Sequence, residues 1–492
     1  MRKTKIVCTM GPRESDKEIL KALAKEMDVA RFNFSHGTHE SHLEMLKSVR
    51  AAAKEAGRPI AMLLDTKGPE IRTGVLADET GSIKIRKGST VVISPIKNDE
   101  RTTEEHIYVT YENIAKDIEV GKSVLIDDGA MELRVDSIDG DALTCTVITG
   151  GRLGSRKGVN LPGVKVGLPG LTEKDIEDIQ FGLENGFDFI AASFIRDAAT
   201  INKIRDMIKA AGAKTRIIAK IESKEGIDNL DEIIDAADGV MVARGDLGVE
   251  IEAKRIPHLQ REMIDKCNSN GKIVITATQM LDSMIRNPRP TRAEVTDVAN
   301  AVSEGTDAVM LSGETASGEY PVEALEMMAS IAEYTEQFVE YKRDRELLDA
   351  ERIAESFLTG KEAKAALRKR ISATTCLSCV TAAEELNAKA IIAPTSSGVT
   401  AIDISKCRPT SEIYAFSPDR TVVRQMMMFW GVTPILAVSK GSTDELLDDC
   451  LDILQKRKVV EKGDIVVFIS GVVSGKRKSQ RSETNTMRII EI

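Results

Sequence analysis

No apolar run in this 492-residue sequence approaches the length of a membrane span, which needs about 20 residues. The first residues, 1–12, are charged and then form a short strand-like stretch, without the apolar core of a signal peptide. We therefore expect a cytoplasmic protein that has no membrane partner.

Cysteine and histidine patterns are equally sparse. The seven cysteines do not form a disulfide framework, and only Cys376 and Cys379 have a suggestive spacing, which merely stacks them in a predicted helix. His36, His39 and His42 recur every three residues but lack a fourth ligand in register. We interpret them as the start of a helix rather than a zinc site.

A concentrated positive charge is also missing. The net charge is −9, and the basic residues are interspersed with acidic ones, so a nucleic-acid partner is not expected. Hydrophobic residues make up 42% of the chain and charged residues 29%, as in soluble globular proteins. The length predicts two or three domains.

Residues 216–250 contain two short apolar strands, each of which ends in charged residues. Lys220 and Glu222 are two positions apart and share one face of the first strand. The second strand ends in Ala243-Arg244-Gly245-Asp246. Charges at the carboxyl ends of successive parallel strands are typical of an active site in an α/β barrel, although Lys220 and Glu222 alone would equally suit a structural ion pair.

The pattern of strands and helices predicts a (β/α)8 TIM barrel. The expected strands are 3–9, 29–34, 60–65, 187–194, 216–222, 239–242, 272–277 and 308–312. Thr172 is the expected N-cap of the helix that follows the third connection.

Two further regions depart from the barrel pattern. Residues 70–166 alternate apolar and polar residues between turns, which predicts an inserted all-β lid that closes on the catalytic face. Residues 323–370 are expected to form a long helix that leads to an open α/β domain, in which the stretch 426–430 packs in the core or at a subunit interface. The expected limits are 1–69 and 167–345 for the barrel, 70–166 for the lid, and 346–492 for the C-terminal domain.

Polar residues at the strand ends suggest the chemistry of the site. Arg31, Asn33 and Ser35 share one face of their strand, and an arginine at a barrel mouth normally meets an anion. Glu222 and Asp246 are hard oxygen ligands suited to Mg²⁺, which takes its remaining ligands from water and substrate. The residues predict a site for a small polyanion and a metal ion.

Several motifs identify a family. IIAKIESKEGI is similar to the active-site signature of pyruvate kinases, and RFNFSHG, LLDTKGPEIRTG, MVARGDLGVE, TATQML and LSGETA resemble that family's other motifs, in the family's order. The resemblance spans 31–316 and continues more weakly to the C-terminus. It implies transfer of the phosphoryl group from phosphoenolpyruvate to ADP, giving pyruvate and ATP, the final step of glycolysis.

The resemblance also assigns roles to residues. Lys220 compensates the charge that develops on the phosphoryl group and enolate, Arg31 and Arg72 hold the phosphoryl group, and Thr278, backed by Ser312, relays a proton through water. The substrate would contact Arg31, Lys220, Ala243, Arg244, Gly245, Asp246 and Thr278, with the backbone amides receiving its carboxylate. The nucleotide would contact Asn33, His36, Arg72 and Lys157.

Two cations are implied. Glu222 and Asp246 would bind Mg²⁺, with Mn²⁺ as a substitute. Asn33, Ser35, Asp65 and Thr66 would bind K⁺, and Glu70 resembles the potassium-requiring members of the family.

A third predicted site lies in the C-terminal domain. Thr395, Ser396, Ser397, Gly398 and Thr400 follow a strand and open a helix, which suits either a phosphate cradle or plain N-capping. With the basic residues Lys476, Arg477, Lys478 and Arg481, the region resembles the family's effector site, for which a sugar phosphate and AMP both remain candidates.

Two other functions share parts of this pattern. A barrel enzyme that handles enolates, such as an aldolase or phosphoenolpyruvate mutase relative, would not need the lid and Lys157, and a metabolite sensor would not need Lys220. The resemblance implies a homotetramer, and we expect this chain to be of the bacterial type without the extra C-terminal domain of some relatives.

Overall fold

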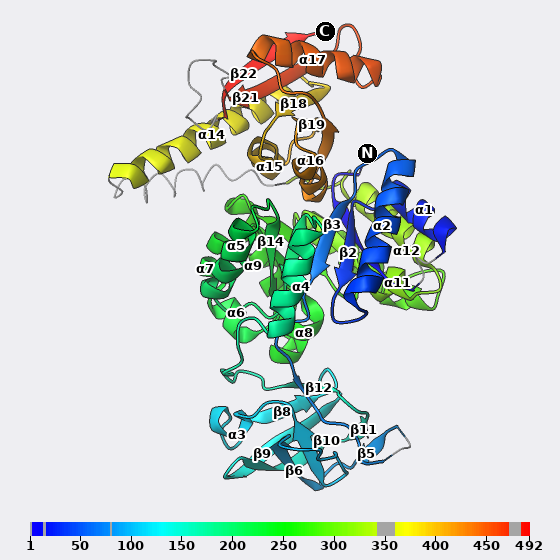
Figure 1. Ribbon diagram of the computed structural model, residues 1–492. Coiled ribbons are helices and arrows are strands. Elements are labelled where there is room, and N and C mark those ends of the chain that lie inside the picture. Colours follow the sequence, from blue (N-terminus) through cyan, green and yellow to red (C-terminus); the bar gives the residue numbers. More distant parts are fainter. Residues whose placement is uncertain (1, 13–15, 79–80, 342–359, 472–483) are drawn as a thin grey trace.

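The structure is a computed structural model that describes residues 2–12, 16–78, 81–341, 360–471 and 484–492. A barrel lies in the middle of the molecule, with an all-β domain at one end and an α/β domain at the other (Figure 1). In the part of the chain that is described, no helix is long and apolar enough to cross a membrane. The boundary expected at 345/346 and the four basic residues at 476–481 lie outside the described residues.

The predicted barrel is confirmed as a closed ring of parallel strands. Short apolar runs, buried on both sides, form its strands. In ring order they are β1 (Lys5–Met10), β17 (Ala308–Leu311), β16 (Ile273–Ala277), β15 (Gly239–Ala243), β14 (Arg216–Ile221), β13 (Phe189–Ala192), β3 (Ala61–Asp65) and β2 (Val29–Asn33).

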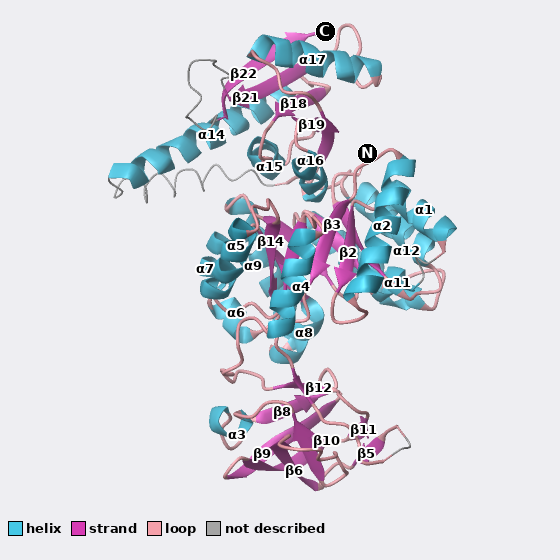
Figure 2. Ribbon diagram, in the orientation of Figure 1, coloured by secondary structure: helices cyan, strands magenta, loops and turns pink. Residues whose placement is uncertain are grey.

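Helices cover the outside of this barrel (Figure 2). The main ones are α1 (Lys17–Glu26), α2 (His39–Ala56), α4 (Glu173–Glu184), α5 (Ala198–Ala210), α7 (Leu230–Ala236), α9 (Ile256–Ser269), α10 (Arg292–Ser303) and α12 (Pro321–Thr335). Short helices α6 (Lys224–Asp228), α8 (Arg244–Glu250) and α11 (Gly313–Ala316) follow three of the strands at their carboxyl ends. Thr172 caps α4 as predicted, because its side chain accepts the amide of Asp175.

The inserted segment is an all-β domain, as predicted, with one short helix, α3 (Ile114–Asp117). Its main sheet has the order β4-β12-β8-β9-β10-β6-β7, and β5 pairs with β11. The strands are β4 (Ile71–Arg72), β5 (Ile83–Ile85), β6 (Thr90–Pro95), β7 (His106–Val109), β8 (Ser123–Ile126), β9 (Met131–Asp139), β10 (Ala142–Thr149), β11 (Gly151–Leu153) and β12 (Gly158–Asn160). An apolar core of its own fills this domain.

The C-terminal domain has a five-stranded sheet of order β20-β19-β18-β21-β22, in which only β22 is antiparallel to its neighbour. Its elements are α14 (Gly360–Glu385), β18 (Ala390–Pro394), α15 (Val399–Lys406), β19 (Glu412–Ser417), α16 (Arg420–Gln425), β20 (Val432–Leu436), α17 (Thr443–Lys456), β21 (Ile465–Gly471) and β22 (Thr484–Glu491).

The stretch 323–370, expected to be one long helix, is helical at both ends but is interrupted after α12. Helix α12 ends at Thr335, and residues 336–341 are not helical. The Glu336 carboxylate instead accepts the backbone amides of Lys3 and Thr4, at 2.8 and 2.6 Å. The mixed-charge pattern of this stretch gave no sign of that tertiary contact.

The aromatic and methionine-rich stretch 426–430 lies in a core, as predicted. All five side chains are at most 4% exposed, and the apolar cluster that holds most of them also contains the inner side chains of the barrel strands. Burial of each large apolar side chain stabilises the fold by about 1.5–3 kcal/mol. The C-terminal domain therefore seals the end of the barrel opposite the lid.

Four aspartates mark this sealed end of the barrel. Along the sequence, one aspartate lies immediately before every second barrel strand. Its carboxylate accepts, at 2.8–2.9 Å, the backbone amide of the second residue of the barrel strand that comes before it in the sequence. They are Asp28 before β2, Asp188 before β13, Asp238 before β15 and Asp307 before β17. Each is paired with a cation, and all but the half-buried Asp238 are buried, so these carboxylates fix the register between neighbouring strands.

Cations from the C-terminal domain pair with two of these aspartates. Arg424 contacts Asp188 at 2.9 Å, and Lys406 and Arg408 contact Asp307 at 2.5 and 2.9 Å. The other two are paired within the barrel itself, Asp28 with Arg2 and Arg58, and Asp238 with Arg205.

Candidate active site

The charged residues predicted at the barrel mouth are brought together around Lys220. Its Nζ lies 3.0 Å from Glu222 Oε1, 3.0 Å from Asp65 Oδ1 and 2.7 Å from Ser193 Oγ. Arg31 Nε lies 2.6 Å from the other oxygen of Asp65. Lys220 is 9% exposed and the two carboxylates at most 1%, so the ammonium is held in place in a site of low dielectric.

Burial and neighbouring charges set the protonation of this cluster. Burial opposes the charge on Lys220, but Asp65 and Glu222 outweigh it and raise the pKa of its ammonium. Burial raises the pKa of Glu222 to about 7, because the charge of Asp246 adds to it and Lys220 compensates only in part. The site thus keeps a permanent cation next to a carboxylate that lacks a full counter-charge.

Asp246 completes a pair of carboxylates that fits a divalent cation. Burial raises its pKa, Lys220 opposes the shift, and the lid carboxylates of Asp128 and Glu70 add to it. Glu222 Oε2 accepts the amide of Phe194 at 2.6 Å, which orients its carboxylate. A buried carboxylate, Glu222, and a half-buried one, Asp246, both under-compensated and without nitrogen or sulfur ligands, form a donor set of the type that Mg²⁺ prefers.

Two of the oxygen residues predicted for K⁺ lie at one level of the barrel, because Asn33 is the register partner of Asp65. The side-chain oxygens of Asn33, Asp65 and Thr66 already have protein partners. Asp65 is shared by Arg31 and Lys220, Asn33 Oδ1 accepts the amide of Ser35, and Thr66 Oγ1 accepts the amide of Ser193. Each of these oxygens retains a lone pair that could bind a cation. The set therefore contains the kind of ligand that K⁺ takes, even with Asp65 paired with Arg31.

Thr278 lies directly after β16 in an unusual backbone conformation. Thr278 has φ 66° and Gln279 has φ 54°, two consecutive left-handed residues that are not glycine. Such residues cost of order 1–3 kcal/mol each and cluster at functional sites. The Thr278 hydroxyl donates to Ala277 O at 2.7 Å and accepts the Gly245 amide at 2.9 Å, so that amide is already engaged, although we expected it to face a substrate carboxylate.

Ser312 follows β17, next to the strand that Thr278 follows. Among the described residues no hydrogen bond joins the two side chains, and the Ser312 amide donates to Glu314 Oε2 at 2.7 Å. Glu314 is buried and also accepts the amide of Leu281 at 3.1 Å, so it ties the ends of β16 and β17 together.

The Arg244 side chain is bonded within the protein, between the loop after β16 and two outer helices. Its N–H groups donate to the carbonyls of Ala277 and Thr278, at 3.1 and 2.6 Å, and to Asp297 Oδ1 at 2.6 Å. Further acceptors are Gln260 Oε1 and Met280 Sδ. A guanidinium has five N–H donors and all are occupied, so only the backbone of Arg244 is available to a ligand.

Two predicted cations belong to the lid. Arg72 Nε lies 2.7 Å from Glu70 Oε2, and its Nη1 donates to Arg156 O at 2.9 Å. Lys157 Nζ lies 2.9 Å from Asp127 Oδ1, and its side chain is 41% exposed. Both are partly exposed and weakly held, as suits groups that change partners when a phosphate arrives.

The three histidines do not converge on a common point. His39 Nε2 contacts Asp178 at 2.7 Å, His42 stacks on Phe34, and the exposed His36 lies in the turn before α2. Cys376 and Cys379 are buried free thiols within α14, so the stacking interpretation is confirmed.

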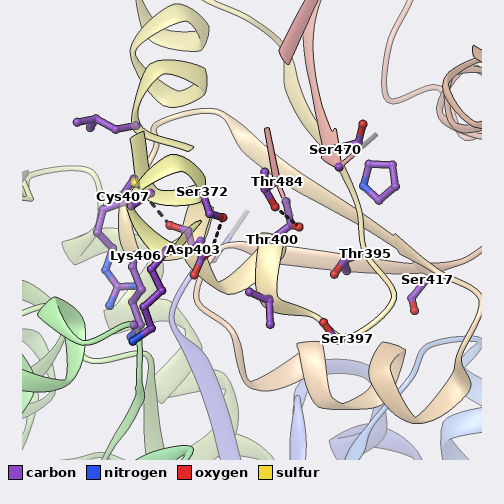
Figure 3. Close-up of a pocket in the computed structure, with 18 of the residues that line it drawn as sticks. Ser372, Thr395, Ser397, Thr400, Asp403, Lys406, Cys407, Ser417, Ser470 and Thr484 are labelled. Atoms are coloured by element: carbon purple, nitrogen blue, oxygen red, sulfur yellow. Dashed lines mark hydrogen bonds between the residues drawn. The ribbon is translucent and has the colours of Figure 1, made fainter. Parts of the chain in front are cut away.

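The predicted effector loop borders a cavity of about 1500 Å³ in and below the C-terminal domain (Figure 3). The lining includes Thr395, Ser396, Ser397, Thr400, Lys440 and Ser470. Two hydroxyls serve the loop itself, because Thr395 Oγ1 accepts the Gly398 amide at 2.9 Å and Thr400 bonds Thr484 at 2.7 Å. The loop is therefore partly self-capping, and Ser396 and Ser397 keep exposed hydroxyls.

Gly398 is held against the barrel rather than in the cavity lining. Its φ is +86°, and a Cβ there would approach Arg216 Nη2 to 3.2 Å. That arginine donates to Ser397 O at 2.8 Å and begins β14, the strand that leads to Lys220.

Sequence reasoning missed Ser193, Phe194 and Glu314. Ser193 follows β13 as Asp65 ends β3 and Lys220 lies near the end of β14, so its place at a strand end was the available signal. The role of Phe194 is carried by its amide, which no side-chain pattern reveals.

Comparison with known proteins gives one consistent result. A family model described as pyruvate kinase, barrel domain, matches residues 1–325, and one described as pyruvate kinase, alpha/beta domain, matches residues 373–490. The chain is 48% identical over 492 positions to a pyruvate kinase of Geobacillus stearothermophilus. It is 46% identical to pyruvate kinases of Staphylococcus epidermidis and Staphylococcus aureus. Each alignment covers 99% of this chain and 80% of the relative.

Proposed function

The chain belongs to the pyruvate kinase family, and from this premise we propose how its own residues transfer a phosphoryl group from phosphoenolpyruvate to ADP. The family activity makes it a phosphotransferase that yields pyruvate and ATP in glycolysis. The family matches leave no support for the two alternatives, an aldolase-like enolate enzyme and a metabolite sensor.

Lys220 is the central residue of the proposed transfer. The bond between phosphorus and the enol oxygen breaks, a bond to a terminal oxygen of ADP forms, and the electron pair remains on the enolate. Phosphoryl transfer needs positioning and charge neutralisation more than a protein nucleophile. A buried ammonium 3.0 Å from two carboxylates is fixed before the reaction begins, and this single observation carries the proposal.

Arg31 is placed to hold the transferring phosphoryl group, because it lies next to Lys220 through their shared partner Asp65. Arg72 and Lys157 would reach the phosphates from the lid when it closes. Asn33 and His36, at the end of β2 and the turn after it, would contact the nucleotide.

Glu222 and Asp246 would hold Mg²⁺, or Mn²⁺ in its place, which supplies positive charge to the phosphoryl oxygens when bound. Asn33, Ser35, Asp65 and Thr66 would hold K⁺. The raised pKa values of both magnesium ligands support the first assignment, since a nearby dication relieves their repulsion.

Thr278 would relay a proton, through water, to the methylene carbon of the enolate, which gives pyruvate. Backbone amides of Ala243, Arg244 and Asp246 would orient the substrate carboxylate at the start of α8, while the Gly245 amide stays bonded to Thr278 Oγ1. Ser312 would support this rim indirectly, through Glu314.

Further proposals concern regulation and organisation. The cavity lined by the hydroxyls of Thr395, Ser396, Ser397 and Thr400, in the loop that also holds Gly398, supports a phosphorylated effector. Membership of the family supports a homotetramer in the cytoplasm. We also propose the domain limits 1–69 and 167–345, 70–166, and 346–492.

The direct experiment measures pyruvate from phosphoenolpyruvate and ADP with Mg²⁺ in potassium buffer and in potassium-free, sodium-free tetramethylammonium buffer. We expect activity with potassium and its loss in tetramethylammonium, and Glu70→Lys should reduce the requirement. Equal activity in both buffers would remove K⁺ from the proposal, and no pyruvate with Mg²⁺ and K⁺ would refute the activity.

A further inference from the structure

We propose that Arg244 is a positioning residue for proton delivery, which holds the Thr278 hydroxyl in its working orientation. The guanidinium lies under the loop that follows β16 and donates to two successive carbonyls, of Ala277 and Thr278. Its remaining donors reach Met280 in the same loop, Gln260 on α9 and Asp297 on α10. One side chain thus ties the loop to two helices of the outer layer.

The loop needs such a support because it contains two consecutive left-handed residues, Thr278 and Gln279. An L-residue in this conformation persists only where its surroundings over-determine it. The carbonyls on one side of the turn are held by Arg244, and the Leu281 amide on the other side is held by the buried carboxylate of Glu314. Arg244, which can only donate hydrogen bonds, therefore holds carbonyl groups of this turn. Glu314, as a carboxylate that can only accept them, holds an amide of the same turn.

The arrangement also fixes the hydroxyl itself. Thr278 Oγ1 accepts the Gly245 amide at 2.9 Å, and Gly245 is the residue after Arg244. The guanidinium and the adjacent amide belong to the same start of α8, so the substrate-facing turn after β15 and the loop after β16 move as one unit. A lysine cannot reproduce this contact, because three donors on one nitrogen cannot reach carbonyls, a carboxylate and an amide oxygen that lie in a fork.

This inference rests on the proposed role of Thr278 in the second half of the reaction. In that step the enolate takes a proton on its methylene carbon, the carbon–oxygen bond becomes a carbonyl, and pyruvate results. The reverse step removes a methyl proton from pyruvate, so exchange of methyl protons for deuterium measures proton transfer without net phosphoryl transfer.

The test compares Arg244→Lys with two other variants. Thr278→Val removes the proposed proton relay. Arg205→Lys is the matched control, because Arg205 pairs with Asp238 at 2.7 Å and donates to Ala236 O, in the same barrel but at the opposite end. Each variant is assayed for kcat and KM in pyruvate formation, and for pyruvate methyl exchange in D₂O, followed by proton NMR, with Mg²⁺, K⁺ and inorganic phosphate in the place of the transferred group.

We expect Arg244→Lys to slow methyl exchange by about tenfold or more, with KM for phosphoenolpyruvate and ADP within about threefold of wild type, and Arg205→Lys to leave both unchanged. Addition of guanidinium ion to Arg244→Ala should restore part of the exchange. The inference is overturned if Arg244→Lys raises KM for phosphoenolpyruvate while exchange is retained, or if it behaves as the Arg205 control does. If Thr278→Val leaves methyl exchange intact, the proposed role of Thr278 as proton relay is wrong. If Thr278→Val abolishes exchange but Arg244→Lys does not slow it, the relay stands and only the role of Arg244 is wrong.

Discussion

At the sealed end of the barrel, Asp28 lies 2.8 Å from Arg2 and 2.9 Å from Arg58 and accepts the amide of Ile6. Burial raises its pKa, but these cations and Lys5 outweigh it and lower the pKa to about 2. At the open end, burial raises the pKa of Glu222 to about 7. Two carboxylates, both almost completely buried in one barrel, therefore have opposite shifts.

The difference shows what each end of the barrel is for. At the sealed end carboxylates have complete sets of protein partners, as at Asp28 and Asp307, and they serve stability. At the open end Asp65 has two cations and a lowered pKa, but Glu222 and Asp246 have incomplete partners and raised pKa values, as suits the magnesium ligands proposed above. Asp188 is intermediate, because burial still raises its pKa although Arg424 lies 2.9 Å away.

The largest expected effect is on stability and follows from removing the carboxylate of a fully paired group of buried charges. Asp307→Asn leaves Lys406 and Arg408 buried without their carboxylate, and removal of one partner of a buried ion pair costs about 3–5 kcal/mol. We expect a clearly lower urea midpoint of unfolding with nearly unchanged activity per folded molecule. Asp206→Asn, at an exposed pair with Lys209, is the control. Equal midpoints for the two variants would mean that the sealed end does not stabilise the fold.

The converse change is Lys220→Met at the open end. We expect the reaction barrier to rise by about 3 kcal/mol or more, a loss of about a hundredfold or more in kcat. The fold should lose less stability than with Asp307→Asn, because Asp65 keeps Arg31 and Glu222 keeps the Phe194 amide.

Lys5→Met is the matched control for this change. Lys5 is a buried lysine of β1 at the sealed end, where its Nζ donates to Val432 O. Turnover of Lys220→Met within a few-fold of the Lys5 variant would contradict the role of Lys220.

The third prediction concerns acid. The folded pKa of Asp28 lies below its ordinary value of 3.8, so its contribution, about 2–3 kcal/mol for a shift of about two units, is complete above about pH 4 and is lost as the pH falls toward 2. The contribution of Glu222 to stability changes with pH in the opposite direction. Its folded pKa of about 7 lies above its ordinary 4.5, so its contribution in metal-free protein is present at low pH and is lost as the pH rises through 7.

Thermal unfolding in EDTA from pH 2.5 to 8 separates the two ends. Asp28→Asn should flatten the acid side of the stability curve, and Glu222→Gln should flatten the neutral side. If the thermal stability of Asp28→Asn depends on pH below 4 as that of the wild type does, the ion pairs of Asp28 do not contribute to stability in solution.

The smallest expected effect is an energetic coupling between the C-terminal domain at the sealed end and the Lys220 site at the open end. An effector in the Thr395–Thr400 loop would act through Arg216, which bonds Ser397 O and begins the strand that carries Lys220. Coupling free energies are typically about 1–3 kcal/mol, so half-saturation for phosphoenolpyruvate should fall when fructose 1,6-bisphosphate, ribose 5-phosphate, glucose 6-phosphate or AMP is added.

The Ser396→Ala, Ser397→Ala double variant should lose this response, and Ser378→Ala on α14 should keep it. If none of the four compounds changes the wild-type saturation curve, or if the double variant responds as Ser378→Ala does, the loop has a structural role only.

The sequence predicted the barrel because each strand is a short apolar run with a charged or polar end. It also placed Lys220 and Glu222 on one side, and their atoms lie 3.0 Å apart. Both signals are local, since they depend on residues within a few positions of each other.

The remaining features are contacts between distant segments. Asp65 was assigned to K⁺ alone, because β3 and β14 are separated by β13 and no local pattern shows that Asp65 also pairs with Lys220. Arg244 was assigned to substrate because its motif adjoins the site, yet its side chain serves a loop 33 residues away. The aspartates before alternate strands were visible in the sequence and were overlooked, because each alone resembles an ordinary turn residue.

Strands β13 and β17 lie directly opposite each other in the barrel ring. The C-terminal domain is attached beneath both, through Arg424 to Asp188 and through Lys406 and Arg408 to Asp307. Two attachments on a diameter oppose rotation of the domain about the barrel axis. Further bonds lie off this diameter, because Arg216, on the strand next to β13, donates to Ser397 O and Lys5 of β1 donates to Val432 O. The domain is therefore joined to the barrel around the ring, and Arg216 connects it directly to the strand that carries Lys220.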